Sequence, residues 1–139
     1  STPSLVDAKK GQISKHWQSY YRDLLYQAAI YPKTERIFVN PVIKLYLCET
    51  EQDKSWLYKV RPWSGHDSHF HVRLACPKNQ PNCEAQAPVA KNSGCDADLK
   101  NWVKDQQDVA LGIKKRPASK GQGVTKTLPI ECQGVLSEP

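Results

Sequence analysis

Five cysteines in a chain of 139 residues are the feature that most constrains its fold. None of them forms a C-x-x-C pair of the kind found in zinc knuckles and thioredoxin-like sites. Structural disulfides fit the spacing better, because closing a short loop such as the one from Cys76 to Cys83 removes conformational entropy from the unfolded chain. Disulfides indicate an oxidising space, secreted or periplasmic. Because five is an odd number, one cysteine is left without a partner in this chain.

Composition favours one compact domain with a loose segment, since 39% hydrophobic residues are accompanied by 10 prolines. No apolar run approaches the ~20 residues of a membrane helix, and the first residues lack the charged and apolar regions of a signal peptide. We therefore expect neither a membrane span nor a signal peptide. The net charge of +6 indicates either ordinary solubility or attraction to a polyanion, such as nucleic acid or an anionic cell-wall polymer.

A helix and a strand are predicted early in the chain. Apolar residues recur at helical spacing from Trp17 to Ala29, with Ser19 as the expected N-cap and Pro32 as the expected stop. Residues 36–39 are then rich in strand-forming side chains.

The dipeptide Asn40-Pro41 predicts the start of a second helix. Asparagine is a favoured N-cap and proline is favoured at the first helical position, so residues 42–48 are expected to be helical. Asp53 is expected to cap a further turn through Trp56, Leu57 and Val60.

The most informative segment runs from residue 64 to residue 76. From His69 onward polar and apolar side chains alternate, which predicts a strand. Its two faces would carry Phe70, Val72, Leu74 and Cys76 on one side, and His69, His71, Arg73 and Ala75 on the other. We expect the first face to pack on the core and the second to display two imidazoles to a cleft.

Beyond residue 77 the chain is rich in Pro, Asn, Gly and Ser, with one compact apolar patch near Leu99, Trp102 and Val103. Residues 114–123 combine high charge with no hydrophobic period, so no regular structure is expected there. No aromatic residues lie between these basic residues, which disfavours a nucleic-acid site. The predicted class is α+β: a small antiparallel sheet flanked by helices, with disulfide-closed loops and a long irregular C-terminal tail.

Three of the four histidines, His66, His69 and His71, fall within six residues. Such clustering favours a site in which one imidazole binds a metal while another contacts the reacting water. The alternatives are chance histidines on a surface strand, or a packed polar cluster satisfied by hydrogen bonds. Two imidazoles on one face repel each other when both are protonated, so their pKa values fall and they serve as neutral ligands and bases. No G-x-S-x-G elbow or glycine-rich phosphate loop offers a competing site.

Four motifs follow one another along the chain: Arg36-Ile37-Phe38-Val39-Asn40-Pro41, Arg61-Pro62-Trp63, His66-x-x-His69-x-His71-Val72-Arg73-Leu74 and Cys76-Pro77. Together they resemble the C-terminal half of the penicillin-insensitive murein endopeptidases. That family belongs to a wider group of zinc peptidases, which includes lysostaphin-like enzymes, D-alanyl-D-alanine peptidases and the hedgehog domain. The likeness runs from about residue 6 to residue 102 and is similar in style through Cys132.

The resemblance implies a zinc peptidase that hydrolyses peptide cross-links of peptidoglycan, at D-alanyl–meso-diaminopimelyl amide bonds in the periplasm. By position, His71 would be a zinc ligand. His69 would lie beside the reacting water and the scissile carbonyl, and His66 would be a further active-site imidazole. Residues 1–104 would form the C-terminal part of the catalytic domain, and residues 105–139 a proline- and lysine-rich, linker-like tail that docks again near Cys132.

The resemblance also implies two more zinc ligands in an upstream H-x-x-x-x-x-x-D motif, which residues 1–65 lack. His16 is the one histidine there, and it is expected to be a solvent-facing helix or loop residue, with a role as replacement ligand as the less favoured alternative. We therefore expect an N-terminal portion of the same protein to supply the missing ligands. A second interpretation is a non-catalytic, basic module that binds the cell wall or a partner.

The cysteines can be paired in a way that agrees with a missing portion. The hypothesis joins Cys76 to Cys83 and Cys48 to Cys95, which leaves Cys132 unpaired within this chain. Its partner would then be a cysteine of the N-terminal portion.

Overall fold

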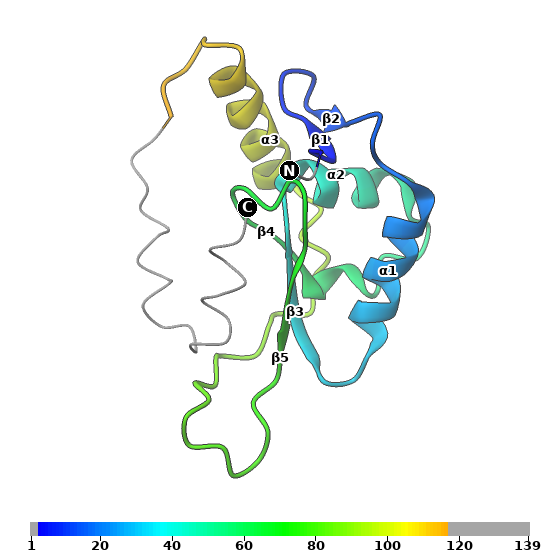
Figure 1. Ribbon diagram of the computed structural model, residues 1–139, viewed down its shortest axis with the longest axis vertical. Helices are drawn as coiled ribbons and strands as arrows, with labels where there is room; N and C mark the ends of the chain where they lie inside the picture. Colours follow the sequence, from blue (N-terminus) through cyan, green and yellow to red (C-terminus); the bar gives the residue numbers. More distant parts are fainter. Residues whose placement is uncertain (1–2, 117–139) are drawn as a thin grey trace.

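The computed structural model describes residues 3–116 (Figure 1). The elements in chain order are β1 (Val6–Asp7), β2 (Gln12–Ile13), α1 (Ser19–Ile30), β3 (Thr34–Val39), α2 (Pro41–Thr50), the 3-10 turn η1 (Leu57–Lys59), β4 (Val60–Pro62), β5 (His71–Leu74) and α3 (Ala97–Ala110). Three helices with two small sheets confirm the α+β class. Within this part of the chain no helix is both long enough and apolar enough to cross a bilayer.

The larger sheet has three strands in the order β4-β3-β5. β5 runs antiparallel to β3, as predicted, and places His71 opposite Phe38 and Val72 opposite Ile37. β4 runs parallel to β3 and places Arg61 on the other side of Phe38. The sheet is therefore mixed, because α2 and η1 form a crossover that returns the chain to the end of the sheet where β3 began.

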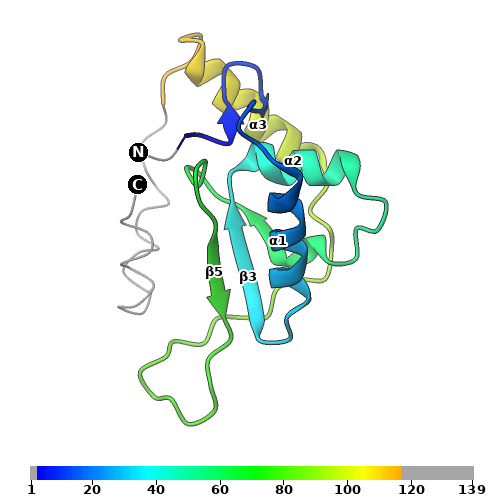
Figure 2. The same ribbon diagram turned by 45° about the vertical axis from the view of Figure 1, so that its right-hand side comes forward.

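α1 packs against β3 and lies on the opposite side of that strand from β5 in the view of Figure 2. Its two buried side chains, Leu25 and Ala29, belong to the same core as Ile37 and Val39 of β3. Because side chains alternate along a strand, Phe38 points to the other face of the sheet. That other face is where the candidate site is built.

The predicted limits of α1 are accurate to one residue. Gln18 takes the cap position in place of Ser19, and its carbonyl accepts a hydrogen bond from Tyr21 N at 3.0 Å. The helix ends at Ile30, before Pro32, as the proline predicted.

The predicted start of α2 is confirmed. The side-chain oxygen of Asn40 accepts a hydrogen bond from Val42 N at 2.9 Å, and Pro41 is the first helical residue. Asp53 accepts from Ser55 N at 2.9 Å and so caps the turn before η1, close to where a further turn was expected.

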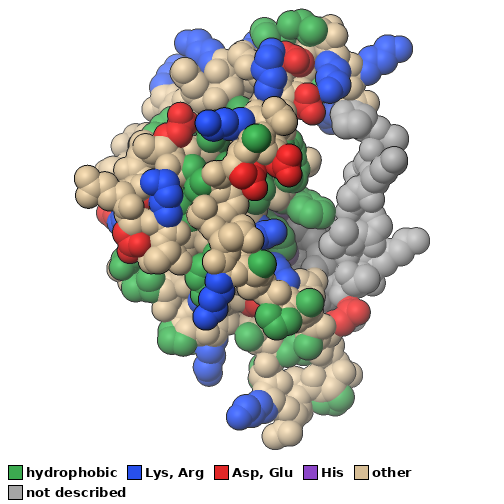
Figure 3. Space-filling view, turned by 180° about the vertical axis from the view of Figure 1, so that it is seen from behind, with side chains coloured by type: hydrophobic (Ala, Val, Ile, Leu, Met, Phe, Trp, Pro, Cys, Tyr) green, Lys and Arg blue, Asp and Glu red, His purple; other side chains and the backbone are tan. Residues whose placement is uncertain are grey.

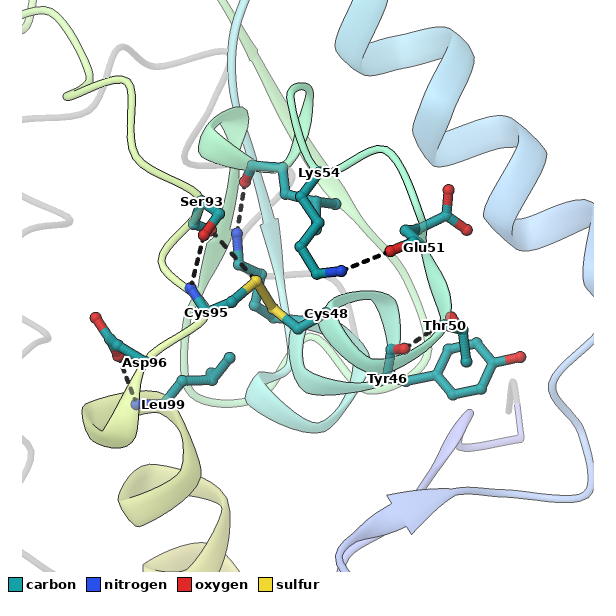
Figure 4. Close-up of a disulfide and its surroundings, with 11 residues drawn as sticks. Tyr46, Cys48, Thr50, Glu51, Lys54, Ser93, Cys95, Asp96 and Leu99 are labelled. Carbon is teal, nitrogen blue, oxygen red and sulfur yellow. Dashed lines mark hydrogen bonds between the residues drawn. A yellow bond between two sulfur atoms is a disulfide. The ribbon is translucent and has the colours of Figure 1, made fainter.

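The disulfide between Cys48 and Cys95 confirms the pairing hypothesised for these two cysteines and ties the end of α2 to the segment before α3 (Figure 4). Ser93 stays beside the bridge, since its hydroxyl accepts from Cys95 N at 3.2 Å. Asp96 follows and caps α3 by accepting from Leu99 N at 3.1 Å.

α3 is the helix that the sequence interpretation missed. The sequence indicated only an apolar patch there, although Asp96 is a favoured N-cap and Leu99 and Val103 are spaced for one helix face. Both of these apolar side chains are buried. The helix runs on to Ala110, across the boundary expected after residue 104.

The second disulfide, between Cys76 and Cys83, is also as predicted. It closes a loop after β5 that has no helix or strand and extends beyond the end of the sheet (Figure 1). Cys132 and the tail expected to dock near it lie outside the described residues.

Candidate active site

The three histidines of the predicted site lie together at the start of β5. The ring centroid of His66 is 5.7 Å from that of His69 and 6.2 Å from that of His71. The rings of His66 and His71 are nearly parallel, with 9° between their planes. These three side chains are called the histidine cluster below.

The loop before β5 places His66 through an unusual backbone. His66 has φ 52° and follows Gly65 with φ 75°, so two successive residues adopt the left-handed region. This region is unfavourable for a residue with a Cβ, and it turns the His66 ring back toward the sheet. The ring is held by its Nδ1, which lies 3.1 Å from the carbonyl oxygen of Ser64.

Asn40 and the N-terminal segment hold this loop in place. Asn40 donates twice, from its side-chain amide to Gly65 O at 2.9 Å and from its backbone N to His66 O at 3.2 Å. Leu5 N donates to Asp67 O at 2.6 Å. The residue that caps α2 therefore also fixes His66, a role that its cap motif did not reveal.

Phe38 forms the floor of the cluster. Its ring centroid lies 5.4 Å from that of His71, 6.3 Å from that of His66 and 5.9 Å from that of Trp63. Trp63 is fixed to β3, the strand of Phe38, because its backbone N–H donates to Val39 O at 2.8 Å. Half-buried aromatic rings next to imidazoles make a partly apolar wall against which a substrate backbone can lie.

The alternation of β5 was predicted correctly, but the burial of its two faces was wrong. His71 and Arg73 are each 2% exposed, whereas Val72 is 41% exposed and Leu74 is 52% exposed. The physical reason is that α1 covers β3 and does not reach β5, while the opposite face of β5 meets Phe38 and the loop after the strand.

Two arginines, Arg36 of β3 and Arg73 of β5, bind the loop that follows β5. Arg73 donates through Nη2 to Glu84 O, and Arg36 of β3 donates to Gln86 Oε1 at 2.7 Å and to Ala87 O at 2.6 Å. Glu35 lies between the guanidinium groups, paired with Arg36 and 3.6 Å from Arg73 Nε. The sequence contained one signal for this arrangement: Glu35 and Arg36 lie within β3, and Arg73 lies within β5.

Burial keeps two of the imidazoles neutral. It lowers the pKa of His66, and the positive charge that His69 can carry adds to this effect against the opposing hydrogen bond to Ser64 O. The pKa of His71 is lowered first by burial and then by the charges of His66, Arg73 and His69. Neutral imidazoles are available as metal ligands or as bases.

The nitrogen atoms of the cluster suit a metal, but the described residues do not complete a metal site. Nδ1 and Nε2 of His71, Nδ1 of His69 and Nε2 of His66 are buried without a hydrogen-bond partner among residues 3–116. Imidazole nitrogens are common ligands of zinc. No group of three or more His, Cys, Asp or Glu side chains in the same range is arranged to hold an ion.

His16 does not join the cluster. It is exposed and lines an open hollow of about 670 Å³ at the β1–β2 hairpin, together with Lys9, Lys10 and Lys15. Seen from behind, Lys and Arg side chains are spread over the outline with Asp and Glu among them (Figure 3). On that face the net positive charge therefore does not form one continuous basic patch.

The described part of this α+β chain thus gathers three imidazoles beside Phe38 at one end of the small sheet. The family model of the penicillin-insensitive murein endopeptidases matches residues 1–137. The chain is 41% identical to the penicillin-insensitive murein endopeptidase of Haemophilus influenzae over 137 residues, which are 97% of this chain and 46% of that protein. The corresponding protein of Klebsiella pneumoniae subsp. pneumoniae is 40% identical over 131 residues, covering 93% of this chain and 45% of the relative.

The chain belongs to the penicillin-insensitive murein endopeptidase family, which confirms the resemblance. It spans about half the length of the curated relatives that it matches.

Proposed function

We propose that this chain is part of a zinc peptidase that hydrolyses peptide cross-links of peptidoglycan. The observation that carries the proposal is the buried His71 imidazole, which stacks on His66 and has no partner for either nitrogen among the described residues. Family membership supports the substrate class, because the relatives are named murein endopeptidases. The proposed bond is the D-alanyl–meso-diaminopimelyl amide.

Each histidine has a proposed role. His71 holds the zinc ion, for which its lowered pKa keeps the ring neutral at pH 7. A zinc ion, when bound, supplies Lewis-acid chemistry that polarises a carbonyl and activates water. His69, half-buried and with its ring centroid 5.7 Å from that of His66, is the residue that accepts the proton of the attacking water, and His66 is a further imidazole of the site.

The remaining zinc ligands are proposed to come from an N-terminal portion of the same protein. The length of the relatives supports this, because less than half of each is matched by this chain. We propose that Cys132 bonds to a cysteine of that portion. The two disulfides of the described part support the periplasm as the place of action, since disulfides persist in oxidising compartments.

The test uses the intact protein with its N-terminal portion and purified cross-linked muropeptides, with products identified by mass spectrometry. His71→Ala is expected to abolish cleavage, whereas His16→Ala, the matched control in the exposed hollow, retains it. Circular dichroism is used to check that both variants are folded. Undiminished cleavage by a folded His71→Ala protein would remove His71 from the mechanism.

The role of Cys132 has a separate test. An intact mass of the native protein without reductant is expected to show no thiol at Cys132 after alkylation. Quantitative alkylation of Cys132 in native material would refute the covalent link and leave the peptidase proposal standing.

A further inference from the structure

Gln106 is a polar residue on the packed face of α3, where the helical spacing predicts an apolar one. Leu99, Val103 and Gln106 follow one another at intervals of four and three residues, so their side chains lie on one face of the helix. Leu99 and Val103 are buried in the core, and Gln106 is half-buried. Apolar packing alone does not account for a glutamine at the third position of such a face.

The partner of Gln106 is Asn40, the residue that caps α2. Gln106 Nε2 donates to Asn40 Oδ1 at 3.1 Å, and Asn40 Nδ2 lies 3.4 Å from Gln106 Oε1, to which it donates. The two side-chain amides are therefore paired through both of their polar atoms.

Two backbone groups fix the orientation of the Asn40 amide. Its Oδ1 also accepts from Val42 N at 2.9 Å, and its Nδ2 also donates to Gly65 O at 2.9 Å. A backbone N–H only donates and a carbonyl only accepts, so the oxygen must face Val42 and the nitrogen must face Gly65. With Gln106 in place, this amide of a residue that is 4% exposed makes two hydrogen bonds as acceptor and two as donor.

The loop that Asn40 holds needs such support. His66 has φ 52°, in the left-handed region that is unfavourable for a residue with a Cβ and persists only where neighbouring contacts enforce it. From the side of α2 these contacts are the bonds of Asn40 Nδ2 to Gly65 O and of Asn40 N to His66 O at 3.2 Å. An Asn40 amide that turns away releases Gly65 O and loosens the loop that carries the His66 ring.

The packing of α3 on α2 brings Gln106 to this place. Cys48, near the end of α2, is bonded to Cys95, just before α3 begins (Figure 4). Asn40 caps the start of α2, and Gln106 lies toward the end of α3. The two helices therefore run antiparallel, joined by the disulfide at one end and by the pair of amides at the other.

We propose that Gln106 is a positioning residue of the candidate active site. It completes the hydrogen bonds of the Asn40 amide and so keeps that amide turned toward Gly65, which sets the place of the His66 imidazole in the histidine cluster. The proposal rests on the proposed function in one respect: it takes the histidine cluster to be the place where the peptide bond is cleaved.

Steady-state kinetics of the intact protein on cross-linked muropeptides give the first test. Gln106→Ala is expected to lower kcat about tenfold with KM within about twofold of the wild type, because a misplaced group slows the chemical step without weakening substrate binding. Alanine is a strong helix former, so the substitution does not weaken α3 itself. A wild-type kcat in Gln106→Ala overturns the proposal.

Gln107→Ala is the matched control. Gln107 is the next residue of the same helix and of the same type, but its amide donates to Lys9 O at 3.0 Å. Its variant is expected to keep the wild-type kcat. An equal loss of kcat in both variants would show that any loosening of α3 impairs cleavage, and would overturn a specific role for Gln106.

Gln106→Glu separates hydrogen bonding from packing. The carboxylate keeps the size of the side chain but has no N–H to donate to Asn40 Oδ1, and its oxygen repels that atom instead. We expect a kcat at least as low as that of Gln106→Ala. A wild-type kcat in the glutamate variant would show that only the volume of the side chain matters, and would overturn the proposal.

A double-mutant cycle tests whether Gln106 acts through Asn40. If it does, Gln106→Ala has no further effect on kcat once Asn40→Ala has removed the shared amide. The double variant is therefore expected to match Asn40→Ala, measured well below the melting temperature of each protein. Losses that multiply would assign Gln106 an effect independent of Asn40 and contradict the proposal.

Hydrogen exchange gives a readout that does not need cleavage. The backbone N–H of Asn40 donates to His66 O, so its exchange reports directly on the hold of the loop. In the intact Gln106→Ala protein we expect this amide to exchange at least about tenfold faster than in the wild type. The N–H of Trp63, which donates to Val39 O, is the internal control and stays unchanged. Unchanged exchange at Asn40 overturns the proposal, whatever the effect on kcat.

The two proposals fail separately. An intact protein that does not cleave muropeptides, yet shows the faster exchange at Asn40 when Gln106 is replaced, loses the proposed function and retains the support of the His66 loop by Gln106. One that cleaves muropeptides, with the same kcat and the same exchange in Gln106→Ala as in the wild type, retains the function and loses the positioning residue.

Discussion

The two disulfide-bonded regions of the molecule are stabilised in different ways. Cys48–Cys95 lies between α2 and α3, where buried residues such as Ile43, Leu47 and Leu99 already form a core. Cys76–Cys83 closes a loop that contains no helix or strand. That loop is fastened to the sheet by Arg36 and Arg73 instead of by apolar packing. A disulfide and hydrogen bonds from arginines therefore hold the loop after β5, where a core is missing.

The largest expected effect is the loss of Cys48–Cys95. The bridged cysteines are 47 residues apart, and the loop-entropy relation gives about 4 kcal/mol of stabilisation for that length. The double variant Cys48→Ala/Cys95→Ala is expected to lose about this amount in urea unfolding. A loss below about 1 kcal/mol would show that the surrounding core, and not the bridge, fixes the position of α3.

A smaller and more local effect is expected for the loop after β5. Cys76 and Cys83 are 7 residues apart, which gives about 2.5 kcal/mol in the same relation. Cys76→Ser/Cys83→Ser is expected to make residues 77–92 sensitive to limited proteolysis while the far-ultraviolet circular dichroism stays unchanged. Equal losses for the two double variants would contradict the dependence on loop length.

Asn40 connects α2 to the histidine cluster. Asn40→Ala is expected to lower stability by about 1 to 2 kcal/mol through the lost cap of α2. Asn40→Asp is the comparison variant, because it keeps the cap acceptor and removes the side-chain N–H donors to Gly65 O and, at 3.4 Å, to Gln106 Oε1. In the Asp variant we expect near-normal stability with faster hydrogen exchange at residues 64–67. If exchange there is unchanged, the side-chain amide does not hold the loop.

A buried lysine of α2 predicts that the stability of the protein depends on pH. Lys44 is 1% exposed and donates to Leu57 O, and burial lowers its pKa to about 7, with the charge of Arg61 as a further cause and that of Asp96 opposing it. Between pH 7 and the ordinary lysine pKa of about 10.4, the unfolded chain binds a proton that the folded chain does not. Stability therefore rises with pH in this window.

The slope assigned to Lys44 is at most about 1.4 kcal/mol per pH unit. Lys44→Met keeps the length of the side chain and is expected to remove the slope, as measured by urea unfolding at several pH values. A slope that persists in the variant would assign the pH dependence to other groups.

Local motifs were predictable from the sequence, and relations between distant elements were not. Asn40-Pro41 determined the start of α2 because a cap and its helix are neighbours in the chain. The alternation after His69 predicted a strand, but the burial of each face depends on which element covers it. α1 stops short of β5, so Val72 is exposed and His71 is buried.

The candidate site shows the same contrast between local motifs and contacts of distant elements. Its three histidines were predicted from their spacing, whereas the roles of Asn40 and Phe38 depend on a sheet register that the sequence does not state. α3 was missed because the polar residues around Leu99 resemble a linker in composition, although the cap Asp96 marked its start.

The zinc content of the intact protein tests the central claim most directly. Metal analysis of the purified protein with its N-terminal portion is expected to give about one zinc per molecule, and about none for the folded His71→Ala variant. One zinc per molecule in both proteins would show that His71 is not a ligand and would contradict the proposed role of the histidine cluster as a zinc site.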